Sequence, residues 1–208
     1  MENRSLLYPQ HEPEIQLKLL GISKKDLSEL RKRKLRVLDI GCGEEARLVQ
    51  YLWENGIEAE GIDPFAKINS PNIMKSKISQ ENPEVESIPR QDKRYHLILS
   101  HANFVLPMGL STCRNLGAKM LAKKGEHPKN IGRRLDAVSL DAQWTVLEAM
   151  RTLKNQGRFV CYPGLTQIGE IMGDDFWETP IKIVHEEVPS RYHQEHEFMK
   201  NRTIIYKL

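Results

Sequence analysis

Cysteine is scarce in this sequence. The 208 residues include three cysteines, Cys42, Cys113 and Cys161, with no C-x-x-C pair among them. An odd number of widely spaced cysteines argues against a disulfide framework and against a paired-cysteine zinc site. His193 and His196 lie close together, but they lack the glutamate of an H-E-x-x-H zinc motif. We therefore expect reduced thiols and no metal site.

Long apolar runs are also missing. No stretch approaches the roughly 18 apolar residues that a membrane-spanning helix needs, and residues 1–5 lack the apolar segment of a signal peptide. The net charge of +3 is too small to indicate a nucleic-acid partner by itself. With 39% hydrophobic and 28% charged residues, the composition is that of a globular protein able to bury its own core. The sequence predicts one cytoplasmic domain over residues 1–208, without membrane attachment.

The most informative stretch joins a short apolar run to a glycine-rich turn. The run begins at Leu35, has the length of a strand, and includes Asp39 just before Gly41-Cys42-Gly43. Two glycines let the backbone adopt positive φ and let a ligand approach it without a Cβ in the way. The next apolar residues recur at helical spacing and predict a helix that ends at Asn55-Gly56. They are Leu48, Val49, Leu52 and Trp53.

A second short strand is predicted to end at Asp63, 22 positions after Gly41. Strand, glycine turn, helix and second strand together form a β-α-β nucleotide-binding unit. In such a unit the turn and the helix N-terminus receive the ligand, and the acid after the second strand binds ribose hydroxyls.

Asp39 distinguishes between two classes of nucleotide ligand. Residues 41–46 fit the dinucleotide fingerprint G-x-G-x-x-G/A, but a carboxylate two residues before the first glycine would repel a pyrophosphate. Glu44 and Glu45 after the turn argue in the same direction. For a ligand with an ammonium group the carboxylate is useful, because a charge-assisted hydrogen bond contributes about 1.5–3 kcal/mol. S-adenosylmethionine carries an ammonium, a sulfonium and a ribose but no phosphate, so the acids favour it over the cofactor of a nicotinamide-dependent oxidoreductase.

Residues 37–43 and 61–63 resemble the first two motifs of the class I S-adenosylmethionine-dependent methyltransferases. The resemblance continues through residues 84–89, 95–100 and 153–160, and covers roughly Leu35 to Tyr162. It implies an α/β chain with a three-layer Rossmann-like methyltransferase fold. The sheet is expected to be mostly parallel and seven-stranded, with a terminal antiparallel strand. The implied cofactor is S-adenosylmethionine, and the implied reaction is transfer of its methyl group.

The resemblance also implies which residues hold the cofactor. The family places an acid near residue 84 to accept a hydrogen bond from the adenine amino group, and Glu86 fits that role nearly as well as Glu84. The predicted cofactor-binding residues are Asp39, Gly41, Cys42, Gly43, Asp63, Pro64, Glu84 and Ser100.

In this family the residues after the fourth strand face the transferred methyl group. His101 and Asn103 are therefore the candidate catalytic residues, for orienting or deprotonating an acceptor, since histidine has a near-neutral pKa. His101 as a packing residue is the alternative interpretation. Residues 100–103 are not the Asn/Asp-Pro-Pro-Tyr/Phe signature of members that methylate nucleobase amines. His96 stands where the family often has aspartate.

Two basic regions lie outside the motifs. Residues 1–34 are expected to form an arm and a helix broken near Gly21, with Ser23 as a fresh N-cap. The run 31–34 is either a solvated helix end or a phosphate-binding patch. A basic insertion spans 107–135, near the expected acceptor site, as a lid or a dock for an anionic acceptor, or as a solvated helix face. Its cations, opposed by Glu126 alone, are Arg114, Lys119, Lys123, Lys124, Lys129, Arg133 and Arg134.

The remaining predicted elements complete the sheet. A third strand is expected within residues 72–79. A helix begins at Ser139 and stops near Asn155, and strands follow at 158–162, 182–188 and 202–207. We predict methyl transfer from S-adenosylmethionine to a small-molecule acceptor, on oxygen or nitrogen, with an anionic acceptor compatible with the insertion. The alternatives are an RNA methyltransferase that uses the basic insertion, and a non-catalytic cofactor-binding partner subunit. The sequence leaves the oligomeric state open.

Overall fold

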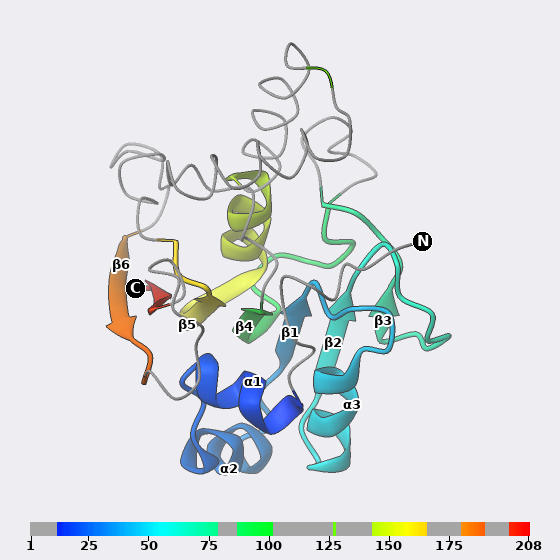
Figure 1. Ribbon diagram of the computed structural model, residues 1–208, viewed down its shortest axis with the longest axis horizontal. Helices are drawn as coiled ribbons and strands as arrows, with labels where there is room; N and C mark the ends of the chain where they lie inside the picture. The colour runs from blue at the N-terminus through cyan, green and yellow to red at the C-terminus, as the bar shows by residue number, and fades with distance from the viewer. Residues whose placement is uncertain (1–11, 79–86, 102–126, 128–142, 166–179, 190–199) are drawn as a thin grey trace.

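The structure is a computed structural model that describes residues 12–78, 87–101, 127, 143–165, 180–189 and 200–208 (Figure 1). Glu84, Asn103, Cys113 and nearly all of the insertion 107–135 lie outside the described residues, so the predictions made for them remain predictions.

A seven-stranded sheet forms the centre of the described fold, with strand order β3-β2-β1-β4-β5-β7-β6. Strands β1 to β5 pair in parallel, whereas β7 is antiparallel to both of its neighbours, β5 and β6. The predicted α/β chain with a seven-stranded mixed sheet is confirmed. The strands are β1 (Val37–Ile40), β2 (Ala59–Ile62), β3 (Ile73–Met74), β4 (Tyr95–His101), β5 (Leu153–Tyr162), β6 (Ile181–Glu187) and β7 (Asn201–Lys207).

The strand order reverses between β1 and β4. From β1 the chain continues to β2 and β3 on one side, then returns to place β4 on the other side. In doubly wound sheets, ligands bind in the crevice outside the carboxyl ends of the strands at this point. Asp39 pairs in register with Gly61 of β2 and with Leu99 of β4, so it lies at the centre of that edge.

Helices pack against both faces of the sheet. One apolar cluster joins α1 (Pro13–Leu19), α2 (Lys24–Lys32) and α3 (Arg47–Glu54) to side chains such as Val37 and Leu97. The opposite cluster joins the helix through 143–152 to side chains of the same strands that point the other way, such as Leu38 and Ile98. Figure 1 shows α1 to α3 gathered on one side and the 143–152 helix on the other. Within the described ranges, no helix is long and apolar enough to cross a membrane.

Local signals fix the first helices as predicted. Ser23 caps α2 through a capping box with Asp26, which explains the break after α1. Arg158 of β5 also binds the Asp26 carboxylate at 2.6 Å, which anchors the N-terminus of α2 to the sheet. Although burial opposes it, the hydrogen bonds from Ser23 and Arg158 hold the pKa of Asp26 below its ordinary value. In α3 the predicted apolar residues Leu48, Val49 and Leu52 are buried and Trp53 is half-buried. The helix ends at Asn55 as expected.

Two predicted boundaries are wrong. The helix through 143–152 ends at Thr152 rather than near Asn155, and β5 begins at Leu153 rather than Arg158. The β4–β5 pairing jumps from Tyr95↔Leu153 to Leu97↔Arg158, so a bulge takes up the intervening residues. The third strand is also shorter than predicted, with β3 covering two residues of the expected stretch 72–79.

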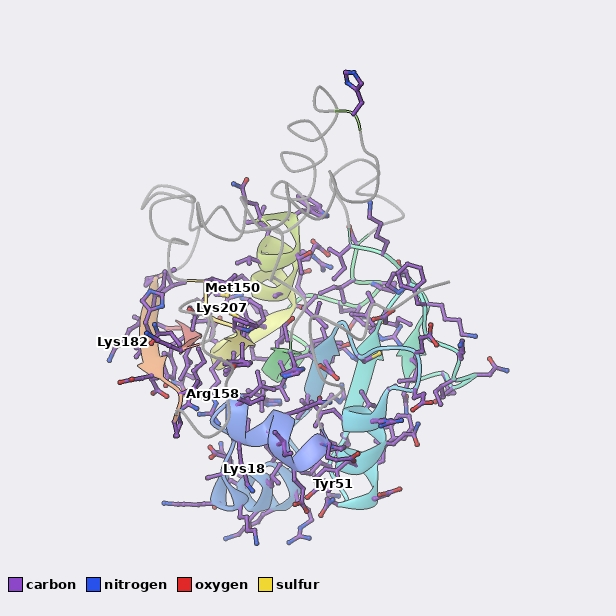
Figure 2. All side chains as sticks on the ribbon, viewed as in Figure 1. Lys18, Tyr51, Met150, Arg158, Lys182 and Lys207 are labelled. Atoms are coloured by element: carbon purple, nitrogen blue, oxygen red, sulfur yellow. The ribbon has the colours of Figure 1, made fainter. Side chains whose placement is uncertain are left out.

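The early end of that helix is held by a buried lysine from the last strand. Lys207 of β7 is 5% exposed and donates from Nζ to the carbonyls of Met150 (2.7 Å) and Leu153 (3.0 Å). Figure 2 shows Lys207 and Met150 next to each other. A cation that hydrogen-bonds the last carbonyls of a helix also offsets the negative end of its dipole.

A second buried polar group ties the loop before β4 to β2. Glu60, 8% exposed, accepts hydrogen bonds from Arg90 (2.6 Å), from the Tyr95 hydroxyl (2.8 Å) and from Arg94. Burial works against the ionised form, but these donors hold the pKa of Glu60 below its ordinary value. The carboxylate is therefore charged and fully engaged at neutral pH.

Candidate functional site

The glycine turn after β1 has the conformation that the sequence predicts. Gly41 and Gly43 both have φ of 76°, in the left-handed region that favours glycine. The amides of Gly41 and Cys42 donate to the Ile62 carbonyl at 2.8 and 3.3 Å, which ties the turn to the end of β2. A Cβ placed on Gly43 would meet no atom of the described residues within 4 Å, so none of them covers the backbone there. The turn can therefore receive a ligand at close range.

The carboxylate of Asp63 is held against this turn by two backbone amides. Its Oδ2 accepts a hydrogen bond from the Gly43 amide at 3.0 Å, and its Oδ1 accepts one from the Phe65 amide at 2.8 Å. The side chain is half-buried. Each carboxylate oxygen has capacity for a further hydrogen bond. The predicted second acid is thus brought beside the first motif, with its orientation set by backbone donors.

Asp39 is buried at the carboxyl end of β1, with 3% of its surface exposed. Among the described residues, its carboxylate oxygens accept no hydrogen bond. Burial, and after it the charge of Asp63, raise the pKa of the Asp39 carboxyl to about 7. The ionised form of Asp39 is therefore disfavoured beside the glycine turn, and a positive ligand would offset that cost.

The side chain of Cys42 packs against Gly61 of β2. A Cβ placed on Gly61 would lie 2.8 Å from the Cys42 sulfur, so the absence of a side chain at Gly61 makes room for it. Burial, Asp39 and Asp63 all raise the pKa of the Cys42 thiol. The thiol stays protonated and is no nucleophile, and the role left to Cys42 is its backbone and its packing.

The acids after the turn are paired with surface cations. Glu44 lies 2.5 Å from Lys67, and Glu45 lies 2.6 Å from Arg47. Their repulsion of a phosphate is therefore smaller than the sequence suggests. Asp39 and Asp63 are the acids that distinguish a cationic ligand from one that carries phosphate. Ala46, in the place of the third glycine of the fingerprint, adopts the left-handed conformation as the N-cap of α3.

The carboxyl end of β4 lies beside the end of β1, where the glycine turn begins. Ser100 is fully buried, and its hydroxyl donates to the Ile40 carbonyl at 3.1 Å. This bond holds the ends of β4 and β1 together. His101 follows in the same strand, where it is half-buried.

His101 stacks on Tyr162, which is not among the predicted site residues. The two ring centroids are 5.9 Å apart with an interplanar angle of 18°, and the residues pair in register at the ends of β4 and β5. Burial raises the pKa of Tyr162 to about 12, so the phenol keeps its proton. The available signal was the position of Tyr162 at the end of the strand predicted beside β4.

The structure brings the described predicted residues to one edge of the sheet. Asp39, the glycine turn and Asp63 lie together at the carboxyl ends of β1 and β2, and exposed Pro64 follows Asp63 directly. Phe65, also not among the predicted site residues, comes next and is 52% exposed. No group of three metal-ligating side chains occurs in the part of the chain that the structure describes.

No family model and no curated protein matches the chain. It is similar to a SAM-dependent methyltransferase from Aquifex aeolicus, at 16% identity and TM-score 0.43, covering 95% of this chain and 98% of that one. A SAM-dependent methyltransferase from Archaeoglobus fulgidus gives 15% identity and TM-score 0.44, covering 98% and 97%. Magnesium protoporphyrin IX methyltransferase from Synechocystis, solved with bound SAM, gives 12% and 0.46, covering 92% and 81%.

The chain spans about half of two longer matched structures, 46% and 56% of their lengths. Identities and TM-scores at this level carry neither a reaction nor a ligand over to this chain.

Proposed function

We propose that this chain is a methyltransferase that binds S-adenosylmethionine outside the carboxyl ends of β1, β2 and β4, and transfers its methyl group to a small molecule. It would do so as one cytoplasmic domain with a three-layer Rossmann-like fold. The observation that carries the proposal is the pair of carboxyl groups, Asp39 and Asp63, on either side of an open glycine turn.

The charge of these two groups selects the ligand. Asp39 is buried, repelled by Asp63, and without a hydrogen-bond donor among the described residues. An ammonium placed against it would stabilise the ionised carboxylate, a contact that contributes about 1.5–3 kcal/mol. A pyrophosphate at the same turn would add negative charge beside two acids, which disfavours a nicotinamide dinucleotide.

The described geometry supports a division of roles among the predicted residues. Asp63, held by the Gly43 and Phe65 amides, keeps acceptor capacity for ribose hydroxyls. Pro64 would border the base, and Glu84 would accept a hydrogen bond from the adenine amino group. Ser100 supports the pocket by joining the ends of β1 and β4. The proposed cofactor-binding residues are Asp39, Gly41, Cys42, Gly43, Asp63, Pro64, Glu84 and Ser100.

When bound, S-adenosylmethionine supplies an electrophilic methyl carbon on a sulfonium, which an acceptor lone pair attacks in line. The chain's contribution is to position the two reactants and to exclude water, effects that can contribute several kcal/mol. His101, its ring plane fixed by stacking on Tyr162, and Asn103 are the proposed catalytic residues, which would orient the acceptor or take its proton.

Calorimetric titration with S-adenosylmethionine and with NAD tests the proposal. We expect the sulfonium compound to bind and Asp39→Asn to weaken it at least tenfold, because the charged partner of the ammonium is lost. Glu58→Gln is the matched control, since Glu58 is an exposed acid paired with Arg36 at the other end of the strands. NAD bound at the turn with no binding of S-adenosylmethionine would overturn the proposal. Transfer of a labelled methyl group across a panel of small acids, amines and alcohols then identifies the acceptor class, with RNA as the competing substrate.

A further inference from the structure

A cluster of cations surrounds His96 at the amino-terminal ends of the central strands, opposite the ends that carry the glycine turn. His96 is the second residue of β4 and Lys154 is the second residue of β5. Arg36 lies just before β1, and Arg33 is the C-cap of α2. Burial, followed by the charges of Lys154, Arg33 and Arg36, lowers the pKa of the His96 imidazole, so the ring is neutral at physiological pH.

The neutral ring cannot satisfy both donors that point at it. The Arg36 amide donates to His96 Nδ1 at 3.1 Å, and a backbone amide can only donate. The ring proton must therefore be on Nε2, because a neutral imidazole carries one donor and one acceptor nitrogen. Lys154 Nζ, also a donor only, lies 3.3 Å from that Nε2. Two donors thus converge with no acceptor between them.

Among the described residues around His96, more cationic than anionic side chains are without an ion pair. A hollow of about 250 Å³ opens beside His96, and its charged lining residues are Asp26, Glu29, Arg33 and Arg158. Asp26 is taken up by Arg158, and Arg36 pairs with Glu58 at the surface. Among the described residues, Arg33 and Lys154 make no ion pair, and Glu29 is the one lining carboxylate without one. Arg31, Lys32 and Lys34, all exposed and without ion pairs in the described ranges, extend the positive surface from Arg33.

We propose that this corner binds an oxyanion of the phosphate class, with one oxygen accepting from both Lys154 Nζ and His96 Nε2 and with Arg33 beside it. An oxygen about 2.8 Å from each nitrogen would satisfy both donors, which lie 3.3 Å apart. The site is separate from the proposed methyl-transfer pocket. Its ligand is either a free phosphate compound or a backbone phosphate of RNA, for which the exposed cations of residues 31–34 would supply further contacts.

The histidine resonances of the full chain, followed by NMR during titration with inorganic phosphate, test this site. Bound phosphate should shift the His96 resonances and raise the pH at which the ring titrates. Lys154→Ala should weaken phosphate binding at least fivefold, while Glu29→Gln should strengthen it by removing the competing carboxylate. Lys182→Ala, an exposed lysine on edge strand β6, is the matched control and should change neither.

No response of His96 to phosphate, or equal weakening by Lys154→Ala and Lys182→Ala, would overturn the proposal. Titration with a single-stranded RNA distinguishes the two ligand sources. RNA binding that falls steeply with salt and weakens in Lys154→Ala indicates backbone phosphates, whereas phosphate binding without RNA binding indicates a free phosphate compound. Affinity for S-adenosylmethionine should be unchanged in Lys154→Ala, so the outcome is independent of the proposed methyl transfer.

Discussion

The amide of Gly43 donates to the carboxylate of Asp63 at 3.0 Å, and this bond joins the two motifs of the pocket. The first motif supplies an open turn after β1, and the second supplies an acid after β2. Because the same carboxylate also accepts from the Phe65 amide, its orientation is set before any ligand arrives. A side chain fixed in this way loses little conformational entropy when a ligand binds.

Asp63→Ala should weaken S-adenosylmethionine binding by about 1.5–3 kcal/mol, tenfold or more, because the ribose contact and the support of the turn are both lost. Calorimetry measures the loss. Asp63→Asn separates the two effects, since its amide oxygen can still accept one backbone hydrogen bond. An unchanged affinity in Asp63→Ala would remove this residue from the pocket.

Asp39 should make stability fall as pH rises from about 4 to about 7. Its folded-state pKa of about 7 lies above the ordinary value of 3.8, so the folded protein holds an extra proton in that window. Each pH unit there should cost up to about 1.4 kcal/mol from this group, with no further loss at higher pH. Urea unfolding at several pH values measures the slope, which Asp39→Asn should flatten. An equal slope in the variant would assign the pH dependence to other groups.

The same carboxyl group should make cofactor affinity rise with pH. Below about pH 7 a cationic ligand must expel the Asp39 proton, so affinity should increase by up to about tenfold per pH unit and level off above. Calorimetry between pH 5.5 and 8.5 gives the profile. Asp39→Asn should bind weakly and almost independently of pH over that range.

Glu60→Ala should destabilise the fold by about 3 kcal/mol, because Arg90, Arg94 and the Tyr95 hydroxyl lose their shared acceptor in a mostly buried position. Glu58→Ala, which breaks an exposed pair with Arg36, should cost less than about 1 kcal/mol. Urea unfolding of both variants makes the comparison. Equal losses would contradict a structural role for Glu60.

Lys207→Met should destabilise the fold by about 1–3 kcal/mol through the loss of two hydrogen bonds to the end of the 143–152 helix. Lys182→Met, on the exposed edge strand, should change stability by less than about 0.5 kcal/mol. Thermal unfolding followed by circular dichroism compares the two. A destabilisation no larger than that of the control would show that the helix end does not depend on Lys207.

Local sequence signals were sufficient for the first half of the fold. Gly41 and Gly43 marked the turn, Ser23 marked a helix start, and the apolar spacing of Leu48, Val49 and Leu52 marked α3. Each of these features depends on neighbours within a few positions. The same holds for Asp39, whose burial follows from its place in an apolar strand.

Features that depend on contacts between distant segments could not be predicted from local sequence signals. The β5 boundary follows from the bulge opposite β4 and from Lys207, which comes from another strand. The hydroxyl of Ser100 is engaged by the Ile40 carbonyl, and His101 meets Tyr162 only because β4 and β5 pair in that register.

The position of β7 has a consequence for how the protein is made. β7 is the last of the seven strands along the chain, yet it lies between β5 and β6 and supplies the strand partner of β6 in the described sheet. During translation β6 leaves the ribosome before that partner exists. Its half-exposed residues Ile183 and Val184 therefore have no paired strand beside them until residue 207 has been synthesised. A chaperone that binds exposed apolar segments would act mainly in this interval.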